Sequence, residues 1–160
     1  MNSIIHTGQV TNGLLEIPIL YLSRFITQNK ADYYKLLQAV RDTGEWEPWL
    51  LYMLRGVEET AIETLRLVEG VRTLMADTKR RLREGHPKLY SQDLLNNLFR
   101  HPYTRIEFVQ QELNVSRPTA TKYLDELAES GLLLKHRAGR NNYYINQPLI
   151  GLFVEREAPK

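Results

Sequence analysis

The stretch 103-YTRIEFVQQELNVSRPTATKYLDELAESGLLLKHRAGRNNYYIN-146 decides the fold of this chain. Apolar residues recur at helical spacing from Ile106 to Leu113, and again from Ala120 to Leu127. Between these two runs, Ser116 is a good helix N-cap and Pro118 suits a first helical turn, where no N–H is needed. The spacing therefore predicts two short helices joined by a tight turn, the second of them spanning Ser116 to Ser130.

The rest of this stretch predicts a two-stranded hairpin. Leu132–His136 and Asn142–Ile145 have strand propensity, and Arg137–Asn141 between them supplies a glycine for the turn and a basic tip. Two helices, a turn and a hairpin in this order resemble the winged helix-turn-helix DNA-binding domains, and the resemblance covers roughly residues 91–150. It implies that the second helix is the recognition helix and that the hairpin is the wing.

Basic and hydroxyl side chains gather at the start of this recognition helix and in the wing. The first half of the helix has no acid, while Asp125, Glu126 and Glu129 lie toward its end, which favours contact with an anionic groove. The alternatives are a solvated helix face and a basic hairpin tip that prevents strand pairing. The residues that we expect to contact duplex DNA are Arg105, Ser116, Arg117, Thr119, Thr121, Lys122, Lys135, Arg137, Arg140 and Asn141.

The sequence pattern of the N-terminal half predicts helices. Residues 1–13 are short and patternless, and helices are predicted from Pro18 to about Thr27 and from Ala31 to Arg41. A third and longest helix, Glu45–Glu84, carries an apolar residue every three or four positions. We expect Trp46 and Trp49 to lie in the core. The basic cluster at residues 79–83 is expected to be a solvated helix end.

A series of motifs follows in order between Gly13 and Ala61: Pro18-Ile19-Leu20-Tyr21-Leu22-Ser23, Asn29-Lys30, Tyr33-Tyr34, Val40-Arg41, Trp46, Trp49 and Gly56-Val57. This series resembles the segment just downstream of the catalytic motif in Fic-family proteins. The resemblance implies a relation to enzymes that mostly transfer AMP from ATP to a hydroxyl side chain of a target protein. Many family members also carry a winged helix after a long linking helix. In this chain we interpret Tyr33 and Tyr34 as packing residues.

Two motifs of that family are missing from the 160 residues. The catalytic loop H-P-F-x-x-G-N-G-R does not occur, and neither does the inhibitory motif [S/T]-x-x-x-E-[G/N]. Leu65 and Arg80 stand where the hydroxyl residue would precede Glu69-Gly70 and Glu84-Gly85. We therefore expect that this chain by itself is not an enzyme. A full-length parent would be a protein adenylyltransferase, and ATP would bind only if an intact catalytic segment stood upstream.

The composition of the chain limits which classes of function remain. The chain has 21 basic and 19 acidic residues, so any affinity for nucleic acid must come from local placement of charge. There is no cysteine, and His86, His101 and His136 have no partners at metal-ligand spacing, so no metal site is predicted. Because the catalytic loop is missing, no cofactor and no catalytic residue is predicted either. No apolar run reaches the length of a membrane span, and we expect a cytoplasmic protein without a membrane partner.

The predicted fold is mainly α, a helical remainder of a Fic fold followed by a winged helix-turn-helix domain with a small β-hairpin wing. The expected divisions are a loosely ordered segment 1–13, a Fic-like helical segment 14–86 with the long linking helix, and the winged domain 87–160. The leading functional hypothesis is a duplex DNA-binding regulator of its own or neighbouring genes. We expect a homodimer, because the long amphipathic helix needs a partner surface.

Two alternatives remain open at this point. The chain can be a truncated part of a Fic adenylyltransferase whose winged helix mediates target recognition or dimerisation. It can also be a winged helix that only docks proteins, since this fold serves several functions.

Overall fold

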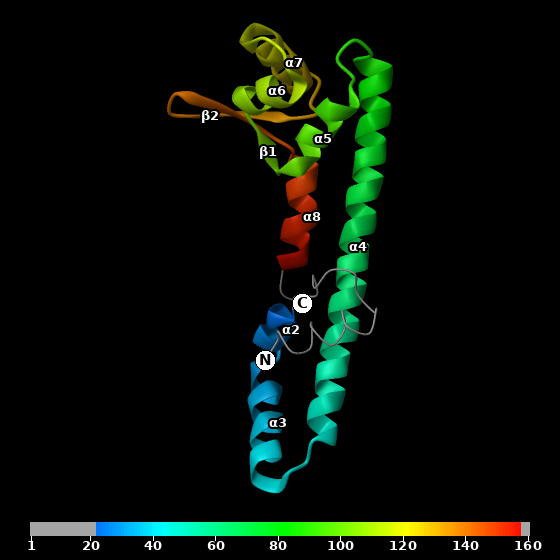
Figure 1. Cartoon of the computed structure of the whole chain (residues 1–160), viewed down its shortest axis with the longest axis vertical. Helices are drawn as coiled ribbons and strands as arrows, with labels where there is room; N and C mark the ends of the chain where they lie inside the picture. Colours follow the sequence, from blue (N-terminus) through cyan, green and yellow to red (C-terminus); the bar gives the residue numbers. More distant parts are fainter. Residues whose placement is uncertain (1–21, 158–160) are drawn as a thin grey trace. The chain divides into compact units, whose positions relative to one another are not determined.

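The structure is a computed structural model that describes residues 22–157, with side chains up to residue 154. Within this range the chain is mainly helical and has one three-stranded antiparallel sheet, which confirms the predicted fold class (Figure 1). The predicted segment 1–13 and the start of the helix expected from Pro18 lie outside the described residues. Contacts divide the chain into two compact units, residues 1–66 and 67–160.

The first unit contains α2 (Ser23–Gln28), α3 (Lys30–Thr43) and the first part of α4 (Glu47–Gly85). The helix α3 ends at Gly44, which takes the left-handed conformation with φ of 72° and donates its N–H to Val40. The chain then reverses, so that α3 runs beside the first part of α4 (Figure 1).

A small apolar cluster joins these helices. Leu22, Trp49 and Met53 are its buried members. Aromatic rings contact them: the Tyr33 ring lies edge-on to that of Trp49, with centroids 5.0 Å apart, and the Tyr52 ring is stacked with Trp49 at 6.1 Å. The positions predicted to pack here are thus confirmed for Trp49 and Tyr33.

Two aromatic side chains differ from the prediction. Trp46 is 58% exposed and Tyr34 is 64% exposed, although both were expected to pack. Trp46 stands one residue before α4, where its carbonyl accepts the N–H of Leu50, so its side chain is not on the buried helical face. Tyr34 follows the buried-side Tyr33 on α3 and touches only the edge of that ring.

The second unit begins within α4 and contains all of the sheet. Its elements in chain order are α5 (Gln92–Arg100), β1 (Tyr103–Thr104), α6 (Ile106–Leu113), α7 (Arg117–Glu129), β2 (Leu134–Ala138), β3 (Asn141–Ile145) and α8 (Gln147–Glu157). The sheet order is β1-β3-β2, and β3 is antiparallel to both neighbours. Tyr144 of β3 is opposite Lys135 on one side and Thr104 on the other.

One apolar core holds this unit together. Its fully buried members come from α4, α5, α6, α7 and β3: Leu82, Leu94, Leu95, Val109, Ala120, Leu124, Leu127 and Tyr144. The last part of α4 therefore packs with the helices and sheet that follow it. The domain limits derived from the sequence stay predictions.

The turn between α6 and α7 forms as the sequence indicates. Asn114 takes the left-handed conformation with φ of 52°, which few residues other than glycine and asparagine adopt at low cost. The Ser116 hydroxyl then accepts the N–H of Thr119 at 3.3 Å and caps α7. The predicted recognition helix agrees with α7 to within one residue at each end.

The hairpin is shifted relative to its prediction. Strand β2 begins two residues later than expected and continues to Ala138, so the turn is shortened to Gly139 and Arg140. Gly139 has φ of 61°, the positive value that a two-residue hairpin turn requires at its first central position. Two elements were not predicted at all, the two-residue strand β1 and the final helix α8.

Candidate nucleic-acid interface

The first half of α7 presents the predicted contact residues at the surface. Ser116, Arg117 and Lys122 are exposed, and Thr119 and Thr121 are half-buried. The two threonine hydroxyls are partly engaged, since Thr121 donates to the carbonyl of Arg117 at 2.9 Å and Thr119 Oγ1 lies 2.8 Å from the Ser116 hydroxyl. These bonds fix the side-chain orientations at the helix start and leave lone pairs free on the hydroxyl oxygens.

Arg117 is held by an acid from the preceding helix. Its Nη1 donates to Glu107 Oε1 at 2.9 Å, and both side chains are well exposed. The Glu107 pKa lies below its usual value, first because the backbone N–H of the same residue donates to the carboxylate, and also because Arg117 is bonded to it. A phosphate that binds Arg117 must therefore compete with Glu107.

Arg105 stands at the N-cap of α6 and contributes a further positive charge near the same acid. Its guanidinium lies 4.4 Å from the ring centroid of Phe108. Its Nε is buried and has no hydrogen-bond partner among the described residues. The stacked ring holds the guanidinium in place, and its positive charge also lowers the pKa of Glu107. The structure thus brings Arg105 and Arg117 to one side of the unit, around a shared carboxylate.

The hairpin is joined to α7 through Asp125. Lys135 donates from Nζ to Asp125 Oδ1 at 2.7 Å, and the hydroxyl of the fully buried Tyr144 donates to the same oxygen at 2.6 Å. Burial raises the pKa of Asp125, but these two hydrogen bonds outweigh it and hold the pKa below its usual value. Burial and the neighbouring carboxylate raise the pKa of Tyr144 well above that of a free phenol. Lys135 is therefore turned toward α7.

The hairpin tip carries the remaining predicted contacts. Arg137, Arg140 and Asn141 are exposed, and the only hydrogen bond seen for them within residues 22–154 beyond the strand ladder is a long one from Arg137 Nε to the Gly139 carbonyl, 3.4 Å. The predicted site residues thus fall into two groups. One lies at the start of α6 and in the first half of α7. The other lies on the hairpin, where Lys135 is bonded to α7 and Arg137, Arg140 and Asn141 lie at or next to the tip.

Sequence reasoning missed the ion pairs that neutralise part of this surface. Glu107 and Asp125 lie ten residues from their cationic partners Arg117 and Lys135 in the chain. The partner residues are on different elements, so no helical spacing could have revealed the pairs. The sequence signal was limited to the presence of the two acids near the basic residues.

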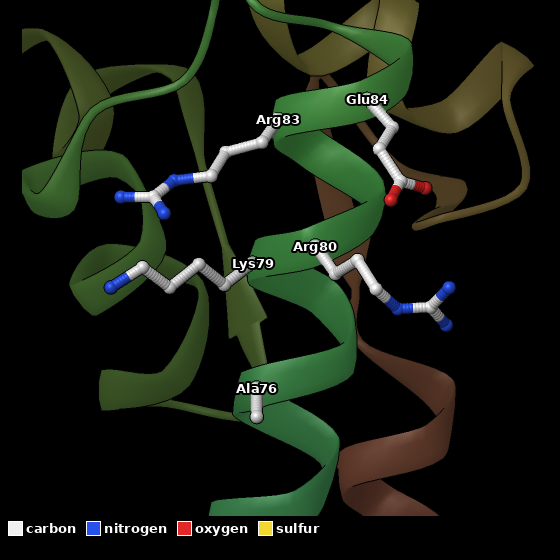
Figure 2. A pocket seen from close by; sticks show the side chains of 5 residues that line it. All are labelled: Ala76, Lys79, Arg80, Arg83 and Glu84. Atoms are coloured by element: carbon white, nitrogen blue, oxygen red, sulfur yellow. The ribbon is translucent and has the colours of Figure 1, made fainter.

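A second basic surface lies on the last turns of α4. It lines a shallow recess of about 260 Å³. Lys79 and Arg83 point to one side of the helix and Arg80 points to another (Figure 2). The residues that line it are Ala76, Lys79, Arg80, Arg83 and Glu84. Arg83 lies over the Tyr90 ring at 4.8 Å, and Lys79 reaches Gln92 at 3.5 Å. Arg80 and Arg83 are exposed, as expected for a solvated helix end.

His86 lies in the turn that follows α4. It is half-buried, and its Nδ1 lies 2.9 Å from Glu126 Oε1 of α7. The described residues contain no group of three or more histidine, cysteine or acidic side chains placed to hold a metal ion. Among the helices described, none is long and apolar enough to cross a membrane.

A family model matches a segment within the second unit, and this segment carries both groups of residues. Residues 74–149 are similar to the C-terminal domain of SoFic-like protein adenylyltransferases. The match runs from the later part of α4 to the start of α8 and covers just under half of the chain. It supports the relation to the Fic family that the motifs between Gly13 and Ala61 indicate, from a different part of the sequence. The matched residues 74–149 thus include both groups of candidate contact residues.

Proposed function

We propose that the SoFic-like C-terminal domain of this chain is a winged helix-turn-helix that binds duplex DNA, and that the chain acts as a DNA-binding regulator. The order of helices and strands from α5 to β3, with a three-stranded antiparallel sheet, supports this proposal. In this arrangement α7 enters the major groove with its N-terminal half, and the β2–β3 hairpin contacts the sugar-phosphate backbone.

The observation that carries the proposal is the distribution of charge over these two elements. No acid occurs between Leu113 and Leu124 or between Ser130 and Asn146, and these segments contain five cations. Lys122, Arg137 and Arg140 are exposed, and the part of the chain that the structure describes offers none of them an ion pair. These three cations can bind phosphates without breaking an existing contact.

Arg117 and Lys135 can bind phosphate only by giving up an ion pair, because each is bonded to an acid. A phosphate must replace Glu107 at Arg117 and Asp125 at Lys135, so part of the electrostatic attraction is offset by the lost ion pair. Exposed ion pairs of this kind are worth about 0–1 kcal/mol, which is less than a charge-assisted bond to phosphate contributes. Exchange of either ion pair for a bond to phosphate is therefore favoured.

A second candidate function is favoured by the family match. The C-terminal domain would then serve a Fic protein adenylyltransferase in target recognition or self-association, and the same basic surface would contact an acidic protein. Nucleotide transfer would require a catalytic loop that these 160 residues do not contain. In this case duplex DNA would bind no better than any other polyanion.

Titration of the 160-residue chain against labelled duplex DNA from its own upstream region tests the proposal. Random duplex DNA of equal length and heparin serve as competitors, and each titration is run at two salt concentrations. The expected result is a preference for the upstream region, with a salt slope of about 0.9 per phosphate contact. Equal affinity for the upstream and random sequences would overturn the proposal that the chain is a DNA-binding regulator and would favour the second candidate function.

A pair of variants distinguishes binding through the proposed interface from attraction by net charge alone. Replacement of Lys122 and Arg140 by alanine removes two unpaired cations from the proposed interface. Replacement of Arg80 and Arg83 by alanine removes two cations from the end of α4 and leaves the net charge of the two variants equal. The proposal requires that the first variant lose affinity and the second keep it. Equal losses would show that binding follows net charge alone.

A further inference from the structure

One face of α4 is apolar and exposed although the opposite face is buried. Trp49 and Met53 pack inside the first unit, whereas Leu51 is 59%, Leu54 64% and Leu65 62% exposed. Val68, one turn farther on, is 49% exposed. Scattered exposed apolar side chains are common, but four on a single helical face are not needed to complete the core of either unit.

These side chains belong to a regular pattern. Successive positions are alternately four and three residues apart: Glu47, Leu51, Leu54, Glu58, Ala61, Leu65, Val68 and Arg72. The helix is continuous over this range, and all eight side chains are exposed except Ala61, which is half-buried. A spacing that averages 3.5 residues defines the contact line of a coiled coil, which is narrower than the apolar face of a helix that only covers a core.

We propose that this face of α4 binds the same face of a second copy of the chain, with the two helices antiparallel around a twofold axis. The sequence of the eight positions is complementary to itself when it is reversed. The apolar layers then place Leu54 against Leu65 of the partner subunit and Leu51 against Val68 of the partner subunit. Because the interface is isologous, each of these contacts occurs twice.

The charges select the antiparallel orientation. In this register Glu47 at one end of the pattern meets Arg72 of the partner subunit, so both ends of the interface are closed by opposite charges. A parallel pair would put Glu47, Glu58 and Arg72 each against an identical charge, which is unfavourable. The antiparallel pair places Glu58 beside the small Ala61 of the partner subunit, which leaves room for its carboxylate to reach water. Such a polar layer lowers affinity and specifies the register.

The oligomeric state of the 160-residue chain tests this interface. Sedimentation equilibrium over a series of concentrations should show a reversible monomer–dimer equilibrium. Replacement of Leu54 and Leu65 by glutamate should shift the chain to monomer, while Leu134→Glu, an exposed leucine of the hairpin, should leave the dimer unchanged. Circular dichroism confirms that the variants keep their helix content. A monomer at every concentration, or a dimer that survives the double substitution, would overturn the proposal.

The register has its own test, since the chain has no cysteine. Leu54→Cys and Leu65→Cys chains, mixed and mildly oxidised, should form a disulfide-linked heterodimer, and neither chain should cross-link efficiently to itself. Self-linking of Leu54→Cys would instead indicate a parallel pair. Charge reversal gives an independent measure: Glu47→Arg or Arg72→Glu alone should weaken the dimer, and the two together should restore it. Failure of the double reversal to restore association would contradict the proposed register.

Discussion

Asp125 of α7 and Tyr144 of β3 are joined by a hydrogen bond of 2.6 Å, in which the phenol donates to the carboxylate. Lys135 of β2 donates to the same oxygen, so that one acid connects the proposed recognition helix to both strands of the hairpin. The angle between helix and hairpin decides whether both can contact one DNA duplex. We therefore expect this acid to act on stability and on binding together.

Tyr144→Phe should destabilise the chain by about 1 kcal/mol, because it removes a hydrogen bond to a charged acceptor while keeping the buried ring. Urea unfolding followed by circular dichroism measures this difference. Tyr143→Phe is the matched control, since position 143 lies on the opposite face of β3. A similar loss for both variants would mean that the bond to Asp125 contributes nothing specific.

Low pH should weaken the hydrogen bonds by which Asp125 connects α7 to the hairpin. The pKa of Asp125 is lower in the folded chain than in the unfolded chain, so its contribution to stability is complete above the unfolded value, near 3.8. That contribution is lost as the pH falls through the folded value. The difference in unfolding free energy between the native chain and Asp125→Asn should therefore be largest at neutral pH and shrink below pH about 4. A difference that is constant with pH would contradict a stabilising role of the ionised Asp125 carboxylate.

Glu107→Gln should strengthen DNA binding. The acid holds Arg117 at 2.9 Å, and its neutralisation frees the guanidinium for phosphate and removes a negative charge from the interface. The expected gain is about 3- to 10-fold in affinity at low salt, and it should diminish as salt is raised. Glu69→Gln, on an exposed position of α4 away from the residues proposed to contact DNA, controls for the change in net charge. Equal gains in the two variants would contradict a role for the Glu107–Arg117 pair.

The parts of the structure that could be predicted are those set by local sequence. The turn before α7 depends on Asn114 in the left-handed region and on the Ser116 cap, and both signals lie within a few residues of the element they begin. The limits of α7 were predicted correctly for this reason. Its polar surface was also correctly placed, because the helical repeat assigns Leu124 and Leu127 to the core.

Most of the parts that were missed depend on residues distant in the chain. Strand β1 has only two residues and exists because Tyr103 and Thr104 pair with β3, forty residues later. The ion pairs of Arg117 and Lys135 likewise need the folded arrangement of neighbouring elements. The helix α8 had a local signal that was overlooked, the Asn146 side chain that accepts the N–H of Leu149 at 3.2 Å.

Gly56→Ala should destabilise the first unit, although alanine is normally the better residue inside a helix. A Cβ at position 56 would lie 2.6 Å from Cδ1 of Phe25, and this ring is itself buried and contacts Tyr52. Displacement of a packed ring costs about 1–3 kcal/mol, which outweighs the helix preference of about 1 kcal/mol for alanine over glycine.

Gly85→Ala gives the matched comparison, because a Cβ there meets no atom within 4 Å. Gly85 is the last residue of α4, so this substitution should leave stability unchanged or raise it by a few tenths of a kcal/mol. Thermal unfolding of both variants measures the two effects under the same conditions. A loss at Gly56 with none at Gly85 would establish that the close approach of α2 to α4 requires glycine. Equal behaviour would show that the Phe25 ring moves aside at little cost.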